Sequence, residues 1–363
     1  MKRDPTEIWD DDLLDRKQDA AFLYNFLVGQ NRQRQEGKRK GSYVVNLDSD
    51  WGGGKTFFLE RFAEDVRSRG HIVVEVNAWR DDHSEDPYVA IMSAIEREFS
   101  PYFSKRTRLK QAWDLTKKSG GRVAVRGGGA VFKALFKKYV GLGLDELVEL
   151  VGEDDSRTDE GDVDGLIAEA SALAGDELEG LFDNYLEHII QMFNQTNASQ
   201  VDFRAKLGAA VKTLSGRIEP PLFIIVDELD RCRPTYAVQL LERVKHLFDV
   251  PNVIFVFGTN VDQLKHSISG AYGAQFDGFR YLKRFFDRTY VFDVPSTRDL
   301  IESYCKEIPP EKIKAPREGL AEVLSKGFDA FGMDLRSIEH IMDIILATAI
   351  AWPHKPRIEI ALL

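Results

Sequence analysis

The sequence has little cysteine and no long apolar run. Its 363 residues include two cysteines, Cys232 and Cys305, which excludes a disulfide framework and a zinc-ligand spacing. No uninterrupted apolar stretch reaches the roughly 18 residues of a membrane span, and no apolar run follows the early charges as it would in a signal peptide. We therefore expect a cytoplasmic protein without a membrane span.

The sequence also lacks an excess of positive charge. Its formal net charge is -10, and 43% hydrophobic with 30% charged residues is typical of a folded chain. A globally basic nucleic-acid coat is excluded, but charge is segregated locally. Residues 105–138 carry eleven Lys or Arg against one acid, and residues 145–187 carry sixteen Asp or Glu against one base. We interpret these segments as pairing with each other; contact of the basic segment with nucleic acid or an anionic membrane surface is the alternative.

One glycine is missing from an otherwise complete phosphate-binding loop. The strict pattern G-x-x-x-x-G-K-[ST] requires glycine where this chain has Ser49. The loop's glycines supply converging backbone N–H groups, its lysine a charge for the β and γ oxygens, and its hydroxyl a Mg²⁺ ligand. The alternative is a glycine turn that caps a helix, with the lysine as surface charge. The residues predicted to bind nucleotide are Trp51, Gly52, Gly53, Gly54, Lys55, Thr56 and Phe57.

A second signal follows later in the chain, where the apolar run "FIIV" ends in Asp227 and Glu228. Carboxylates at the tip of a strand beside the loop are what magnesium and an attacking water need. We predict that Asp227 and Thr56 hold Mg²⁺ and that Glu228 orients or deprotonates water. A strand ending in solvated acids is the alternative, but both signals occur in the order that a nucleotide site requires.

The alternation of apolar runs with helical patterns predicts an α/β fold with a parallel P-loop NTPase sheet. The strands are expected in "SYVVNL", "HIVVEVNAW", "PLFIIVDE", "NVIFVFGTN" and "TYVFDV". A linker is expected after a helix at Arg16–Gln30, and only helices are expected after Pro295. The predicted domains are 1–99 and 201–297 as two parts of the core, 100–200 as a mainly helical insertion, and 298–363 as a helical lid, with a further domain beyond it left open.

Polar residues at two other strand tips are weaker candidates. Asn260, or Thr259 beside it, is predicted to sense the γ-phosphate or position water, and an ordinary turn is the alternative. Asn77 and Trp79 are predicted to border the nucleotide, with a packed tryptophan as the alternative. We expect Arg231 to have a structural role at the tip of the Asp227 strand.

Three stretches together resemble the KAP P-loop NTPases: "SDWGGGKT", "VEVNAW" and "IIVDELDRC". The resemblance implies an ASCE-type core, in which an added strand lies between the loop strand and the Asp227 strand. It implies ATP rather than GTP as the nucleotide, and the chain has no guanine-specifying N-K-x-D run. It also implies the soluble branch of the family, a role in bacterial defence against phage, and protein partners. Ser49 departs from the family pattern and leaves the turnover rate open.

Several arginines could complete the site. The stretch "YLKRFFDRTYVFDVP" is similar to the AAA+ segment that carries an arginine finger, so Arg284 and Arg288 are candidates acting in trans within a homo-oligomer. A salt-bridged basic helix face is the alternative. Arg336 resembles a second sensor arginine that closes over the nucleotide; an arginine satisfied by local acids is its alternative.

The sequence therefore predicts an ATPase that uses ATP and Mg²⁺ as a switch or assembly module. Two alternatives remain: an ATP-bound scaffold that hydrolyses weakly, and a nucleic-acid translocase that uses the basic segment.

Overall fold

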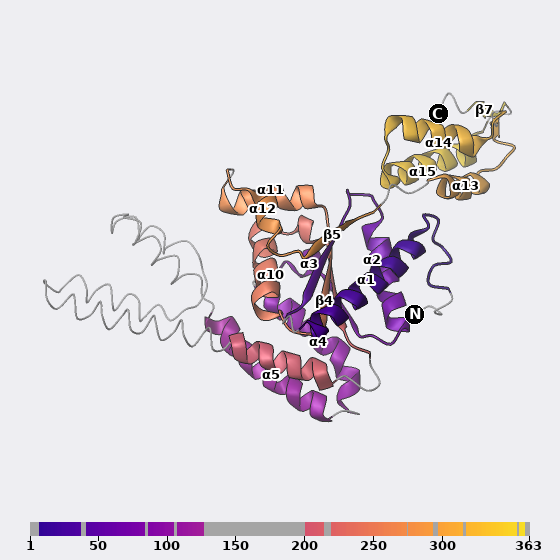
Figure 1. Cartoon of the computed structure of the whole chain (residues 1–363). Coiled ribbons are helices and arrows are strands. Elements are labelled where there is room, and N and C mark those ends of the chain that lie inside the picture. Colours follow the sequence, from indigo (N-terminus) through magenta and orange to yellow (C-terminus); the bar gives the residue numbers. More distant parts are fainter. Residues whose placement is uncertain are drawn as a thin grey trace, which may run out of the picture. The chain divides into compact units, whose positions relative to one another are not determined.

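The computed structural model describes residues 7–37, 41–83, 86–104, 107–126, 200–213, 219–273, 275–292, 297–314, 317–353 and 356–359 (Figure 1). The chain divides into two compact units, which we describe separately. The first unit comprises Met1–Lys110 and Gly208–Leu363, and the second comprises Gln111–Leu207.

The first unit is built on a parallel sheet of five strands in the order β2-β3-β4-β1-β5. Because β4 lies between β1 and β3, the added strand that the resemblance implied is present, and the predicted α/β fold is confirmed. The register pairs Asp48 at the end of β1 with Thr259, and Asp227 at the end of β3 with Gly258. The strands are β1 (Tyr43–Asp48), β2 (Val73–Asn77), β3 (Leu222–Asp227), β4 (Val253–Thr259) and β5 (Arg288–Val291).

The central strands are apolar on both faces, as expected for a sheet covered by helices on each side. Every residue of β4 is buried, and in β1 and β3 all but the last residue are buried. Phe58 and Phe62 of α2 (Lys55–Ser68) pack on one face together with Leu23 of α1 (Arg16–Glu36). The helices α10 (Pro234–Leu247) and α11 (Val261–Tyr272) lie on the opposite side of the sheet (Figure 1).

Two predicted boundaries were wrong. The residues after Gln30 form the last turns of α1 and not a linker, because Asn31 hydrogen-bonds Asn252 at 3.1 Å and Arg34 pairs with Asp287 at 2.5 Å. The strand predicted to reach Trp79 ends at Asn77. The Asn77 side chain accepts a hydrogen bond from the Arg80 backbone N–H and begins the short helix α3 (Ala78–Asp81).

Three helices follow the sheet and share a small core of their own. Ile301, Phe328, Ile338, Met342 and Ile345 meet in this core. The expectation of helices alone after Pro295 was wrong, because β6 (Ile313–Lys314) pairs with β7 (Ile358–Glu359). The helices are α13 (Arg298–Glu307), α14 (Leu320–Phe331) and α15 (Leu335–Ala351).

The remaining elements include the helices α4 (Pro87–Phe103), α12 (Gly278–Leu282) and the 3-10 turn η1 (Leu229–Arg231) of the first unit, and α5 (Thr107–Arg126), which runs into the second unit. Residues 200–213 are also helical. Most of the predicted charged insertion, residues 127–199, lies outside the described residues, so its internal charge pairing stays a prediction. Among the helices that the structure describes, none has the length and apolar character to cross a membrane.

Candidate nucleotide-binding site

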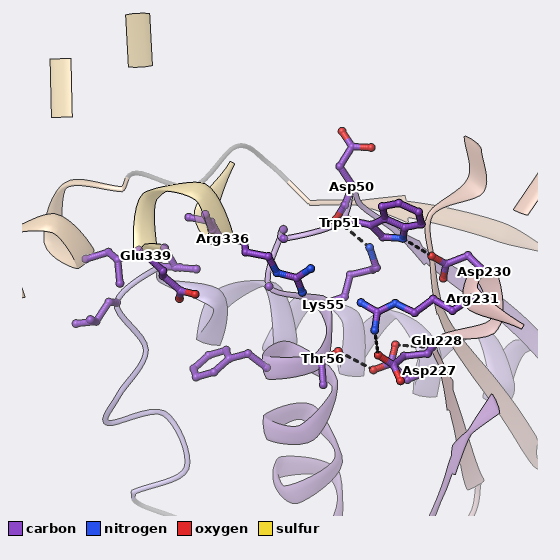
Figure 2. A pocket seen from close by; sticks show the side chains of 18 of the residues that line it. Asp50, Trp51, Lys55, Thr56, Asp227, Glu228, Asp230, Arg231, Arg336 and Glu339 are labelled. Carbon is purple, nitrogen blue, oxygen red and sulfur yellow. Dashed lines mark hydrogen bonds and ion pairs between the residues drawn. The ribbon is translucent and has the colours of Figure 1, made fainter. Parts of the chain in front are cut away.

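A cavity of about 350 Å³ opens where the carboxyl ends of β1 and β3 meet the start of α2 (Figure 2). This is the edge of a parallel α/β sheet where ligands bind. The β1–α2 loop and the first turn of α2 line one part of it, and the tip of β3 and η1 line another. Side chains of the N-terminal segment, α13 and α15 complete the lining. The predicted residues 51–57, Asp227, Glu228 and Arg336 all line it.

The loop has the backbone conformation that its glycines were expected to provide. Gly52 and Gly54 both have φ of 80°, in the left-handed region that favours glycine. A Cβ on Gly53 would lie 1.9 Å from the Ser49 hydroxyl oxygen. The Ser49 side chain therefore occupies the space beside Gly53 that a side chain at position 53 would need. A Cβ on Gly52 would lie 3.0 Å from that of Arg336, which shows how closely α15 approaches the loop.

Lys55 is held back over its own loop. Its ammonium group donates to the carbonyl oxygens of Ser49 and of Asp50, the latter at 2.9 Å. Burial lowers the pKa of Lys55, while the carboxylates of Asp230 and Asp227 act in the opposite direction. The lysine is thus a partly desolvated cation, which raises its attraction for an anion entering the cavity.

Asp227 joins the strand tip to the helix that follows the loop. Its Oδ2 accepts a hydrogen bond from the Thr56 hydroxyl at 2.8 Å, and its Oδ1 accepts one from the Glu228 backbone N–H at 2.8 Å. Burial raises the pKa of this carboxyl above its ordinary value, although its two hydrogen bonds and the charge of Lys55 act in the opposite direction. A hydroxyl and a carboxylate oxygen form the hard donor set that Mg²⁺ prefers, so the residues present fit that ion.

Glu228 has an unusual backbone conformation, and two donors contact its side chain. Its φ of 62° is left-handed, which is uncommon for glutamate. The Asn77 amide donates to its Oε2 at 2.8 Å, and the Arg231 guanidinium donates to its Oε1 at 2.5 Å. Asn77 thus contacts the acid Glu228 but does not line the cavity, and its predicted place beside the nucleotide stays a prediction.

Asp230 and Arg231 also line the cavity, although we expected only a structural role for Arg231. The Trp51 indole donates to Asp230 at 2.7 Å, which ties the loop to the turn after β3. The Arg231 guanidinium carbon lies 5.6 Å from the centre of the Trp79 ring, and Trp79 is 55% exposed. The motif "DELDR" places both residues just after the tip of β3, but it does not indicate which of its three acids Arg231 contacts.

The model of the KAP family P-loop domain matches residues 20–348. The chain belongs to this family. It is therefore a P-loop NTPase domain, and nucleotide binding and NTP hydrolysis are the general activities of such domains. No curated protein matches the chain.

The lining of the KAP domain's cavity includes apolar side chains, of which only Phe57 was predicted. Leu13 and Leu14 of the segment before α1 face it together with Phe57, Leu300 and Leu335. The segment is fastened by its neighbour Asp11, whose carboxylate accepts from Nε of the buried Arg61 at 3.1 Å. The Arg61 guanidinium also covers the Phe57 ring, with 4.3 Å from its carbon to the ring centre. A phosphate-binding loop flanked by apolar side chains suits a nucleotide base.

Three other predicted residues of the KAP domain do not line the cavity. Asn260 is buried, caps α11 by accepting from the Gln263 N–H at 3.0 Å, and donates to Asp50 at 3.1 Å. Arg284 and Arg288 have exposed side chains near the start of β5, and neither lines the cavity. Their predicted roles as phosphate sensor and as arginine fingers stay predictions. Among the described residues, no group of three or more His, Cys, Asp or Glu is arranged to hold a metal ion.

Proposed function

We propose that this KAP domain binds ATP with Mg²⁺ and hydrolyses it. The observation that supports this most directly is the hydrogen bond between Thr56 and Asp227, 2.8 Å long, at the mouth of a glycine loop that carries Lys55. Two sequence signals 171 residues apart thereby meet at one edge of the sheet. The proposed phosphate ligands are the backbone N–H groups of Gly52, Gly53 and Gly54, with the Lys55 ammonium on the β and γ oxygens.

In the proposed reaction, the oxygen of a water molecule bonds to the γ-phosphorus while the bond from that phosphorus to the β–γ bridging oxygen breaks. The products are ADP and inorganic phosphate. Glu228 orients the water and accepts its proton. Thr56 and Asp227 would hold Mg²⁺, which supplies neutralisation of the charge on the phosphate oxygens. Lys55 contributes a fixed positive charge from the protein to the same oxygens.

The apolar side chains of the lining support a base-bearing ligand over a bare polyphosphate. Leu13, Leu14, Phe57 and Leu335 line the cavity and would cover the faces of a purine. Arg336, at the start of α15, lines the same cavity from the other side of the loop. In Figure 2 the side chains of Arg231 and Arg336 point toward the cavity from opposite sides. This arrangement supports a part for α13–α15 in covering the bound nucleotide.

We further propose that the domain acts as a switch or assembly module, with a second copy supplying Arg284 to the bound nucleotide. The exposure of Arg284 and its absence from its own chain's cavity support a contribution in trans. The roles in phage defence and in partner binding rest on the family resemblance alone. Translocation on nucleic acid rests on a basic segment of which residues 127–138 lie outside the described residues.

An ATP-bound scaffold with weak hydrolysis is the second candidate. One observation favours it: both carboxylate oxygens of Glu228 are engaged, by Asn77 and by Arg231. A water molecule would have to compete with two fixed donors for this base.

Phosphate release and nucleotide affinity together separate the two candidates. Lys55→Ala should abolish ATP binding in calorimetric titrations, and Glu228→Gln should keep ATP affinity while stopping phosphate release. Chelation of Mg²⁺ should stop release from the wild-type protein. Turnover that does not depend on Glu228 under any condition would favour the scaffold, and unchanged ATP affinity in Lys55→Ala would contradict the nucleotide site itself.

A further inference from the structure

Arg231 is a cation in the cavity to which the proposed reaction assigns no part. It lines the cavity with Lys55 and Thr56, and its side chain is 31% exposed. Its guanidinium contacts one oxygen of Glu228 at 2.5 Å, and its carbon lies 5.6 Å from the centre of the exposed Trp79 ring. In Figure 2 the Arg231 side chain extends from the turn after β3 toward Lys55 of the phosphate loop.

Resting on the proposed function, we propose that Arg231 is a ligand of the terminal phosphate of the bound nucleoside triphosphate, and that it leaves Glu228 when it binds this phosphate. Arginine binds phosphate oxygens through two parallel N–H groups, and a terminal phosphate carries more charge than one carboxylate. The exchange replaces a single contact with Glu228 by a stronger pair of contacts. Glu228 then keeps only its Asn77 donor and gains a free oxygen for water.

The exchange would depend on the number of phosphates. A diphosphate ends at the β position, so the terminal group that attracts Arg231 is missing and the Arg231–Glu228 pair persists. Arg231 would thus discriminate triphosphate from diphosphate and free Glu228 only when the β–γ bond is present. Trp79 supports this because an aromatic face stabilises a guanidinium group that moves across it.

The competing explanation is purely structural. Glu228 and Arg231 are three residues apart, and their ion pair closes the turn η1 after β3. On this view the loss of Arg231 would lower thermal stability and would change the affinities for diphosphate and triphosphate by the same factor.

Calorimetric titration of the purified chain, with Mg²⁺ present, distinguishes the two explanations. The ligands are ADP and the non-hydrolysable ATP analogue with an imido group between its β and γ phosphates. Arg231→Gln should weaken binding of the analogue about 10- to 100-fold, the range for one lost charge-assisted contact, and should leave ADP binding within about twofold. Arg231→Lys should lie between Gln and wild type, because it keeps the charge but not the fork.

Arg233→Gln is the matched control. Arg233 lies two residues further on, is 61% exposed and pairs with Asp82 at 2.9 Å, and it does not line the cavity. This variant should bind both ligands like the wild type. Equal weakening of both ligands in Arg231→Gln, or no weakening of either, would overturn the proposal. Failure of the wild type to bind either ligand would instead overturn the proposed function.

Tryptophan fluorescence gives a readout that a structural role would not produce. The Trp79 component, obtained by comparison with Trp79→Phe, should change when wild-type protein binds the ATP analogue and should not change with ADP. The analogue-specific change should be absent in Arg231→Lys and in Arg231→Gln at saturating ligand. The same change with both ligands, or its persistence in both variants, would contradict the movement of Arg231.

Discussion

The hydroxyl of Thr56 donates to the carboxylate of Asp227 over 2.8 Å, and this bond joins the first turn of α2 to the tip of β3. Thr56 follows β1 and Asp227 ends β3, and these two strands are not neighbours because β4 lies between them. The hydroxyl and the carboxylate are fixed at the distance where one small cation can contact both.

Removing the Thr56 hydroxyl should uncouple nucleotide binding from Mg²⁺. Thr56→Ala removes one metal ligand, so ATP affinity in the presence of Mg²⁺ should fall about 10-fold or more and become insensitive to chelation. Thr56→Ser keeps the oxygen and should retain the dependence on Mg²⁺. Titrations with and without a chelator measure this, and an unchanged Mg²⁺ dependence in Thr56→Ala would exclude Thr56 as a metal ligand.

Replacing Asp227 by asparagine should stabilise the nucleotide-free protein while it abolishes Mg²⁺-dependent turnover. Because burial raises the pKa of Asp227, the folded state binds this proton more tightly than the unfolded state. The free energy of unfolding therefore falls as the pH rises above the ordinary aspartate pKa of about 3.9. At pH 7.5 Asp227→Asn should therefore have a larger free energy of unfolding than the wild type, and this gain should shrink toward pH 4.

Thermal and denaturant unfolding at several pH values measure this gain. The control is Asp262→Asn, because Asp262 is exposed and a hydrogen bond from Lys265 lowers its pKa. That variant should show no gain at neutral pH. A less stable Asp227→Asn protein at pH 7.5 would show that burial of the charge is not the dominant effect.

Loosening the N-terminal segment should weaken ATP binding without affecting a ligand that lacks a base. Asp11→Ala removes the partner of Arg61 and frees the segment that carries Leu13 and Leu14. We expect the ATP dissociation constant to rise about 5- to 10-fold, and that of inorganic tripolyphosphate to stay within about twofold, because the lost contacts are apolar. Calorimetry with both ligands tests this.

Asp65→Ala is the control for this prediction. Asp65 pairs with Arg69 at 3.0 Å on the same helix and does not line the cavity, so its loss should change neither affinity. Equal weakening of ATP and tripolyphosphate in Asp11→Ala would show that the segment supports the phosphate loop and not the base.

Arg284→Ala should reduce phosphate release about 10³-fold and leave ATP affinity unchanged, if a second copy supplies this arginine during turnover. Mixing tests the contribution in trans. Glu228→Gln subunits cannot turn over but keep Arg284, so adding them to Arg284→Ala subunits should restore part of the release. No recovery on mixing at concentrations where the two variants associate would contradict a finger at this position, and Arg288→Ala is the variant to compare.

Much of the site could be predicted from sequence because its chemistry is local. The glycines and Lys55 follow one strand, and Asp227 ends another, so the carboxyl ends of a parallel sheet bring them together whatever the details. The strand order came from the family resemblance, since nothing in the apolar runs specifies which strand β4 lies beside.

The contacts that were not predicted depend on single backbone angles or on distant segments. Arg231 contacts Glu228, whose backbone is left-handed, and the local sequence indicates neither the contact nor that conformation. The end of α1 looked like a polar linker, but Asn31 and Arg34 find partners more than 200 residues away. Tertiary contacts of this kind override local propensity.

Gly258 lies near the end of β4, where it is paired with Leu47 of β1 and with Asp227 of β3. Its lack of a side chain matters at this position. A Cβ there would lie 2.9 Å from the Asp227 carboxylate oxygen and 2.5 Å from Leu59 of α2. A methyl group at position 258 would push against the Asp227 carboxylate from β4, and none of its nearest contacts belongs to the phosphate loop. A single methyl group at this buried position of the sheet would therefore affect hydrolysis, through Asp227, more than nucleotide binding.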